Sequence, residues 1–135
     1  MTEWTMAAAV ESIPVVTAAV DDLLEALDCP MKAQMQIDIA IDELLGNIAH
    51  YAYTPGTGEV TVRFDFDEGS RAVDITFIDG GIPYNPLERE DPDVTLAPDA
   101  RKVGGLGIFL VKRTMDGMRY ERRDGKNVLT IRKNI

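Results

Sequence analysis

The hydrophobic pattern predicts an α+β fold in two layers, in which a mainly antiparallel sheet is covered on one face by about three helices. Two observations carry this prediction. Apolar and polar residues alternate over residues 60–66 and 73–77, which is the pattern of half-buried strands. Apolar residues instead recur every three or four positions over residues 16–27 and 31–53, which is typical of amphipathic helices.

Composition indicates one globular domain over residues 1–135, with 45% hydrophobic and 27% charged residues. A net charge of −9 disfavours nucleic acid and anionic membranes as partners, because both are bound through Lys and Arg. A single cysteine, Cys29, allows no internal disulfide. There is no basic leader and no apolar run long enough to span a membrane, so we predict a cytoplasmic protein.

The first half of the chain reads as a short strand followed by two helices. Residues 3–10 form the strand, and Ser12 is placed to cap the first helix. Cys29-Pro30 interrupts the helical pattern, and a longer helix follows over residues 31–53. Proline and glycine in the segment 54–58 end it.

The second half reads as strands around one further helix. Asp124-Gly125 is a strong signal for a two-residue hairpin turn. Three prolines mark an irregular stretch, which we interpret as a lid, because loops of such length are usually functional. The predicted elements are strands at 60–66 and 73–77, a lid at 84–103, a helix at 105–115, and hairpin strands at 118–123 and 126–132.

Glu43 and Asn47 lie one turn apart on the long predicted helix, beside its apolar face. The Asn47 carbonyl oxygen is a hard ligand that suits Mg²⁺, which keeps most of its waters. Glu43 is placed to accept hydrogen bonds from those waters, or to take a proton from an attacking hydroxyl. A solvated helix face would explain the same pair.

Asp79 ends a predicted strand and is followed by Gly80 and Gly81. Glycines let a flat ring approach the backbone, and a carboxylate selects an amine such as adenine N6. A plain Asp-Gly turn is the alternative. Thr130, in the middle of the last predicted strand, could reach this carboxylate through its hydroxyl, although strands favour threonine anyway.

A glycine-rich run, Gly104-Gly105-Leu106-Gly107, opens the predicted third helix. Free N–H groups and the helix dipole favour an anion there. Arg101 and Lys102 come just before the run, where they would attract phosphate or simply be solvated. The spacing fits neither a P-loop nor a Rossmann fingerprint. Together with the acid and amide positions, the run indicates a site for a magnesium nucleotide.

Four segments in this order resemble the boxes of the GHKL ATPases, which have the Bergerat fold, and in particular their anti-sigma-factor serine/threonine-protein kinase branch. They are DELLGNIAHYAY (42–53), IDGGIPYNPLE (78–88), GGLGIFLVKRTMDGMRY (104–120) and NVLTIRK (127–133). The chain departs from the broader pattern at Pro83, where many members have a second glycine. The resemblance spans nearly the whole chain and implies a two-layer sandwich of the Bergerat type.

The resemblance also implies roles for individual residues. Asn47 would coordinate Mg²⁺, Glu43 would be the catalytic base and a water-mediated metal contact, and Asp79 would bind adenine with help from Gly81 and Thr130. The phosphates would be served by the run Gly104, Gly105, Leu106 and Gly107, with Lys102 beside it, under the lid. The implied cofactors are ATP and Mg²⁺.

The partners implied by the resemblance are a sigma factor and an anti-anti-sigma protein with a STAS domain, whose serine or threonine would be phosphorylated. Members of this branch are often homodimers. Two alternatives stay open. In the first, the chain is a nucleotide-binding regulatory module that sequesters a partner without phosphorylating it. In the second, it is the ATP-binding part of a split histidine kinase.

Overall fold

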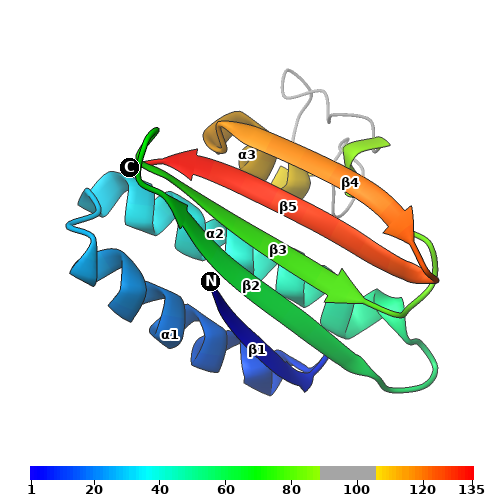
Figure 1. Ribbon diagram of the computed structural model, residues 1–135. Helices are drawn as coiled ribbons and strands as arrows, with labels where there is room; N and C mark the ends of the chain where they lie inside the picture. The colour runs from blue at the N-terminus through cyan, green and yellow to red at the C-terminus, as the bar shows by residue number, and fades with distance from the viewer. Residues whose placement is uncertain (89–105) are drawn as a thin grey trace.

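A computed structural model describes residues 1–88 and 106–135, and its sheet is antiparallel throughout (Figure 1). Five strands lie in the order β1-β2-β3-β5-β4. The strands are β1 (Thr2–Ala7), β2 (Glu59–Asp67), β3 (Ala72–Asp79), β4 (Gly117–Arg123) and β5 (Lys126–Asn134). The helices are α1 (Ile13–Ala26), α2 (Met31–Asn47) and α3 (Leu106–Thr114).

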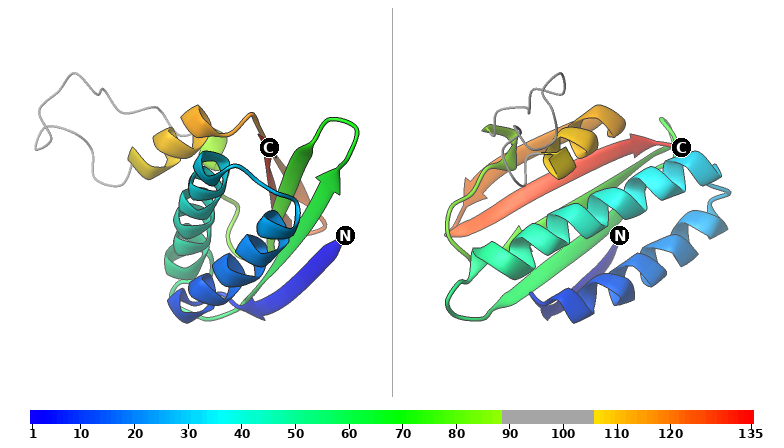
Figure 2. Two further views of the ribbon diagram at one scale, coloured as in Figure 1. Left: turned by 90° about the vertical axis from the view of Figure 1, so that its left-hand side faces the viewer. Right: turned by 180° about the vertical axis from the view of Figure 1, so that it is seen from behind.

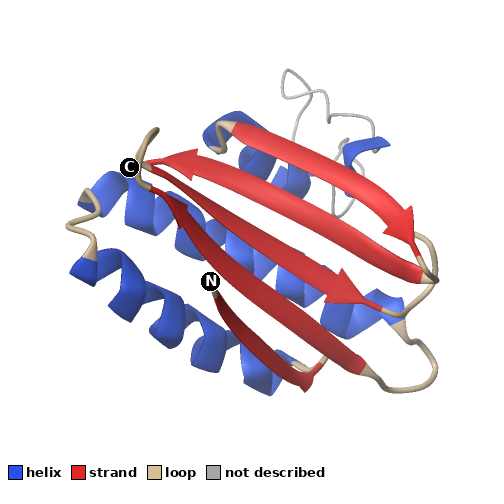
Figure 3. Cartoon of the chain, in the orientation of Figure 1, coloured by secondary structure: helices blue, strands red, loops and turns tan. Residues whose placement is uncertain are grey.

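The three α-helices of the described residues lie on the same face of the sheet, so the molecule has two layers (Figures 2 and 3). Helix α2 packs between α1 and α3 and contacts both. This arrangement confirms the predicted α+β fold, with an antiparallel sheet covered on one face. No helix in the described part of the chain is long and apolar enough to cross a bilayer.

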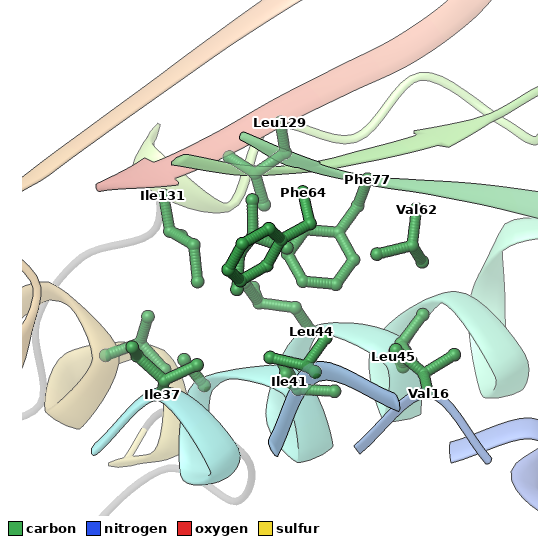
Figure 4. Close-up of a cluster of buried hydrophobic side chains, with 14 of the residues drawn as sticks. Val16, Ile37, Ile41, Leu44, Leu45, Val62, Phe64, Phe77, Leu129 and Ile131 are labelled. Carbon is green, nitrogen blue, oxygen red and sulfur yellow. The ribbon is translucent and has the colours of Figure 1, made fainter. Parts of the chain in front are cut away.

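One hydrophobic core fills the space between the layers (Figure 4). In β3 every second side chain, including Ile75 and Phe77, turns inward and is almost fully buried. Ile37, Ile41 and Leu44 of α2 meet them from the helical layer. Burying each such side chain stabilises the fold by about 1.5–3 kcal/mol, so the alternating and helical patterns dictate which face of each element points inward.

Most predicted boundaries are within a few residues of those observed, and two local details differ. Helix α2 ends at Asn47 and continues as a turn of π-helix over Ile48–Ala52. Ser12 holds the N-cap position of α1, but its hydroxyl donates to the Ala7 carbonyl instead of capping the helix. The hairpin turn is confirmed, because Asp124 and Gly125 both have positive φ, as the two central residues of a type I′ turn require.

Candidate functional site

A cavity of about 570 Å³ opens between the C-terminal half of α2, the end of β3 and the β4–β5 hairpin. Its volume lies within the range of about 300–1,000 Å³ common for small-molecule sites. The polar side chains in its wall are Glu43, Asn47, Tyr51, Asp79, Tyr84, Tyr120 and Asn127. Three of the residues that the sequence singles out, Glu43, Asn47 and Asp79, therefore line one cavity together.

Asp79 is the inward-facing residue at the last position of β3, and only 5% of its surface is exposed. Its Oδ1 atom accepts a hydrogen bond of 2.9 Å from the Gly81 backbone N–H and one of 3.0 Å from the Asn127 side-chain amide. These two donors occupy Oδ1. Among the described residues no donor reaches Oδ2, so that oxygen is available to a ligand in the cavity.

The turn after Asp79 presses against the π-helical turn that follows Asn47. A Cβ atom on Gly81 would lie 2.3 Å from the Ala52 carbonyl oxygen, which leaves no room for a side chain. The next residue, Ile82, donates its backbone N–H to the same carbonyl over 2.9 Å. The need for glycine at position 81 therefore comes from backbone contact, and this contact fixes the Asp79 carboxylate relative to α2.

Tyr53 ties the same turn to the start of β2. Its hydroxyl donates to the Glu59 carbonyl oxygen at 2.6 Å and accepts from the Gly80 backbone N–H at 2.7 Å. Its ring lies over Gly58, where a Cβ atom would come within 2.3 Å of a ring carbon. Tyr53 therefore has a supporting role behind the cavity, whereas Tyr51 lines the cavity and is 65% exposed.

Asn127 is a cavity residue that the sequence patterns did not single out. It lies directly opposite Asp79 in the β3–β5 register and is 5% exposed. Its amide nitrogen donates to Asp79 Oδ1 and, at 2.8 Å, to the Ile82 carbonyl oxygen. The alternation of side chains along β5 could have identified it, because Asn127 shares the inward face with Leu129 and Ile131.

Thr130 does not occupy the place that the sequence analysis gave it. The register pairs Thr130 with Thr76, and their hydroxyl oxygens are 3.0 Å apart. Its neighbours along β5, Leu129 and Ile131, belong to the core, so Thr130 faces the other side of the sheet. The expected bridge from Thr130 to Asp79 is therefore corrected, and Asn127 makes that contact instead.

Helix α2 carries Glu43 and Asn47, one turn apart, into the wall of the cavity. The Asn47 amide nitrogen Nδ2 is buried and has no hydrogen-bond partner among the described residues. A buried donor left unpaired costs about 1–3 kcal/mol, and most buried polar groups in folded proteins are paired. The unpaired Asn47 amide in the cavity wall is what we expect of a group whose hydrogen-bond partner belongs to a bound ligand.

The first turn of α3 lies against Glu43. A Cβ atom on Gly107 would come within 2.2 Å of the Glu43 carboxyl carbon, so glycine at this position is what allows the helix and the carboxylate to approach. Leu106 begins α3 and is 43% exposed. Lys102, Gly104 and Gly105, together with lid residues 89–103, lie outside the described residues.

No group of three or more His, Cys, Asp or Glu side chains in residues 1–88 and 106–135 is arranged to hold a metal ion. A cation at this site would depend on an amide oxygen, waters and the ligand's own oxygens. Mg²⁺ is commonly bound in that way, with few protein ligands and several retained waters. The donor set of the cavity therefore fits a magnesium ion carried by a nucleotide.

Comparison with known proteins defines the class. The family model described as the histidine kinase-like ATPase domain matches residues 6–133, so the chain belongs to this family. This confirms the family that the four sequence boxes predicted. The chain is also similar to the Serine/threonine-protein kinase BtrW of Bordetella bronchiseptica, with 30% identity over 100 residues that cover 74% of this chain and 70% of that protein.

Proposed function

We propose that the chain binds Mg-ATP in the cavity and transfers its γ-phosphoryl group to a serine or threonine of a STAS-domain anti-anti-sigma partner, thereby controlling a sigma factor. The observation that carries this proposal is the joint presence of Asp79, Glu43 and Asn47 around one cavity of nucleotide size. The family and the kinase relative support it. The chain acts as one ATP-binding unit over residues 1–135 in the cytoplasm.

Each cavity residue has a distinct role in this proposal. Asp79 Oδ2 accepts a hydrogen bond from the adenine amine, because Oδ1 is already occupied by protein donors. Asn47 holds the magnesium ion through its carbonyl oxygen, and its unpaired Nδ2 donates to a ligand oxygen. Gly81 supports the adenine end through its contact with Ala52.

Bound Mg-ATP supplies the phosphoryl group and a cation that neutralises the phosphate oxygens. Glu43 takes the proton of the attacking hydroxyl as the new bond between the hydroxyl oxygen and phosphorus forms and the bond to ADP breaks. The first turn of α3, including Gly107 and Leu106, lies beside Glu43, where helix N–H groups favour an anion. From the sequence alone, we propose that Lys102, Gly104 and Gly105 also serve the phosphates, under a lid at 84–103. Residues 89–105 lie outside the described residues.

The test is incubation of the protein with γ-labelled ATP and a STAS protein encoded beside it. We expect acid-stable label on serine or threonine, and we expect Glu43→Ala to lower the rate by about 10²–10⁴. Asp42→Ala is the matched control, because this neighbouring acid lines a different groove, with Val10 and Ile13 beside α1. ATP binding without transfer would leave a regulatory module that only sequesters its partner, and acid-labile label on histidine would indicate a split histidine kinase.

A further inference from the structure

We infer that Tyr120 and Asn127, on the β4–β5 hairpin, are positioning residues that select the nucleotide base by fixing which atoms of Asp79 face the cavity. The inference rests on the proposed ATP binding and not on phosphoryl transfer. It assigns a role to the hairpin, which the helix and glycine motifs did not include. The hydrogen bonds around Asn127 carry the argument.

All hydrogen-bonding positions of the Asn127 amide are used. Its Oδ1 accepts from the Tyr120 hydroxyl at 2.5 Å and from the Tyr84 backbone N–H at 3.2 Å. Its Nδ2 donates its two hydrogens to Asp79 Oδ1 and to the Ile82 carbonyl oxygen. Because the donors Tyr120 and Tyr84 lie on one side and the acceptors on the other, the amide cannot turn over without facing donors to donors.

The fixed amide determines what Asp79 offers to a ligand. Asn127 Nδ2 and the Gly81 N–H both donate to Oδ1, so this oxygen has no room for a further donor. Oδ2 remains as the acceptor at this point of the cavity wall. A base that presents an amine there gains a hydrogen bond, whereas a base that presents a carbonyl oxygen places two acceptors against each other.

The hairpin also holds the backbone on which Asp79 depends. Arg122 Nη1 donates to the Gly81 carbonyl oxygen over 2.9 Å, and Asn127 reaches the next carbonyl, that of Ile82. In the β4–β5 register Arg122 and Asn127 are direct partners. Both contacts therefore come from the same hairpin position, and the base end of the cavity is held from the sheet edge as well as from α2.

The experiment measures the dissociation constants of Mg-ATP and Mg-ITP by calorimetry, since inosine carries a carbonyl oxygen where adenine carries its amine. We expect the unmodified protein to favour ATP by at least about 10-fold, the lower end for a hydrogen bond to a charged group. Asn127→Asp keeps the shape and the two accepting positions but removes both donors. It should weaken ATP binding by about 10-fold or more and reduce the preference over ITP.

The pH dependence of ATP binding distinguishes this role from a general loss of packing, which would not change it. Among the described residues the Tyr120 hydroxyl bonds to the side chain at position 127, and the Arg122 guanidinium bonds to the nearby Gly81 carbonyl oxygen. The new carboxyl group of Asn127→Asp would lie beside Asp79. When it is protonated it can donate to Asp79 again. ATP binding by this variant should therefore recover as the pH is lowered from 8 to 5.5, relative to the unmodified protein.

Tyr120→Phe is the milder variant, and it removes one hydroxyl without adding charge. It should reduce the preference for ATP over ITP by roughly 3-fold, because a single neutral hydrogen bond contributes about 0.5–1.5 kcal/mol. Thr130→Val is its control, because it removes a hydroxyl from β5 on the opposite face of the sheet and should leave the preference unchanged. Thermal unfolding of each variant verifies that it is folded.

The outcomes separate the two proposals. If the unmodified protein binds neither nucleotide, ATP binding is refuted and the inference with it. If it binds ATP but Asn127→Asp and Tyr120→Phe keep the original preference for ATP over ITP, the positioning role is refuted while ATP binding stands. Failure of phosphoryl transfer alone would not change the dissociation constants of Mg-ATP and Mg-ITP, so it would leave the inference intact.

Discussion

The position of Gly107 relative to Glu43 leaves no space for even a methyl group between α3 and this carboxylate. A Cβ atom on Gly107 would lie 2.2 Å from both the carboxyl carbon and Oε2 of Glu43. The obstructed atoms belong to the end of a flexible side chain, so an added methyl group would move the carboxylate and leave the backbone in place. Orientation of the proposed base and stability of the fold can therefore be separated at this position.

Gly107→Ala should lower phosphoryl transfer by about 10²-fold, because displacement of a reacting group by about 1 Å has effects of that size. The free energy of unfolding should change by less than about 1 kcal/mol, since alanine is the better helix former. Transfer rate and denaturant unfolding are the two measurements. An unchanged rate would mean that the Glu43 carboxylate is not needed where the structure places it.

Gly46→Ala is the matched control for that substitution. A Cβ atom on Gly46 meets nothing within 4 Å, and the residue lies inside α2 between Glu43 and Asn47. Alanine there should stabilise the fold by about 0.5–1 kcal/mol and leave transfer unchanged. Loss of activity in this variant would show that the rate responds to any change on α2.

Gly81→Ala, unlike Gly107→Ala, should lower the stability of the fold directly. Its Cβ atom would meet the carbonyl oxygen of Ala52 at 2.3 Å and the carbonyl carbon at 2.6 Å, so backbone has to move. Overpacking of this kind costs about 1–3 kcal/mol, and the shift would carry Asp79 with it. Denaturant unfolding should show a lower free energy of unfolding, and calorimetry should show weaker binding of ATP. Unchanged stability would contradict the close contact between this turn and the π-helical turn.

A pair of acids between α1 and α2 makes stability depend on pH. Partial burial, a hydrogen bond to Asp21 and the charge of Asp21 raise the pKa of Asp38 from its ordinary value of 3.8 to about 7. The folded state therefore keeps a proton between about pH 4 and 7 that the unfolded state loses, and stability falls as the pH rises through this window. Because Asp38 is only half-buried, solvent screening limits the effect to about 1 kcal/mol.

Asp38→Asn should remove this loss, so the variant should gain melting temperature over the unmodified protein at pH 8 and much less at pH 5. The exposed neighbour Asp22 supplies the control, because Asp22→Asn changes the net charge equally without touching the pair. Thermal unfolding at the two pH values is the measurement. Equal gains at both values would show that Asp38 and Asp21 do not share a proton in the folded state.

The sequence predicted the layers because periodicity reports burial directly. Period two placed Ile75 and Phe77 on the inward face of β3, and the Asp124-Gly125 pair defined the hairpin and its register. The cavity residues Glu43, Asn47 and Asp79 were found because helix spacing and strand ends fix where a side chain begins. These features depend on residues close together in the chain.

The remaining features depend on contacts between distant segments. The hydroxyl of Thr130 alone does not predict its place, whereas the inward-facing Leu129 and Ile131 on either side assign Thr130 to the other face of the sheet. Asn127 acquires its role only from the β3–β5 register. The π-helical turn over Ile48–Ala52 has no pattern of its own in the sequence, and its carbonyl at Ala52 matters because Gly81 packs against it.

The most direct test of the central proposal, an ATP site organised around Asp79, is calorimetric titration of Mg-ATP into the unmodified protein and into Asp79→Asn. In the variant the new amide must turn its oxygen toward the Gly81 and Asn127 donors, which leaves its NH₂ group facing the adenine amine. We predict measurable binding to the unmodified protein and at least about 10-fold weaker binding to the variant. Absence of heat with the unmodified protein, or equal affinity in both, would contradict the account.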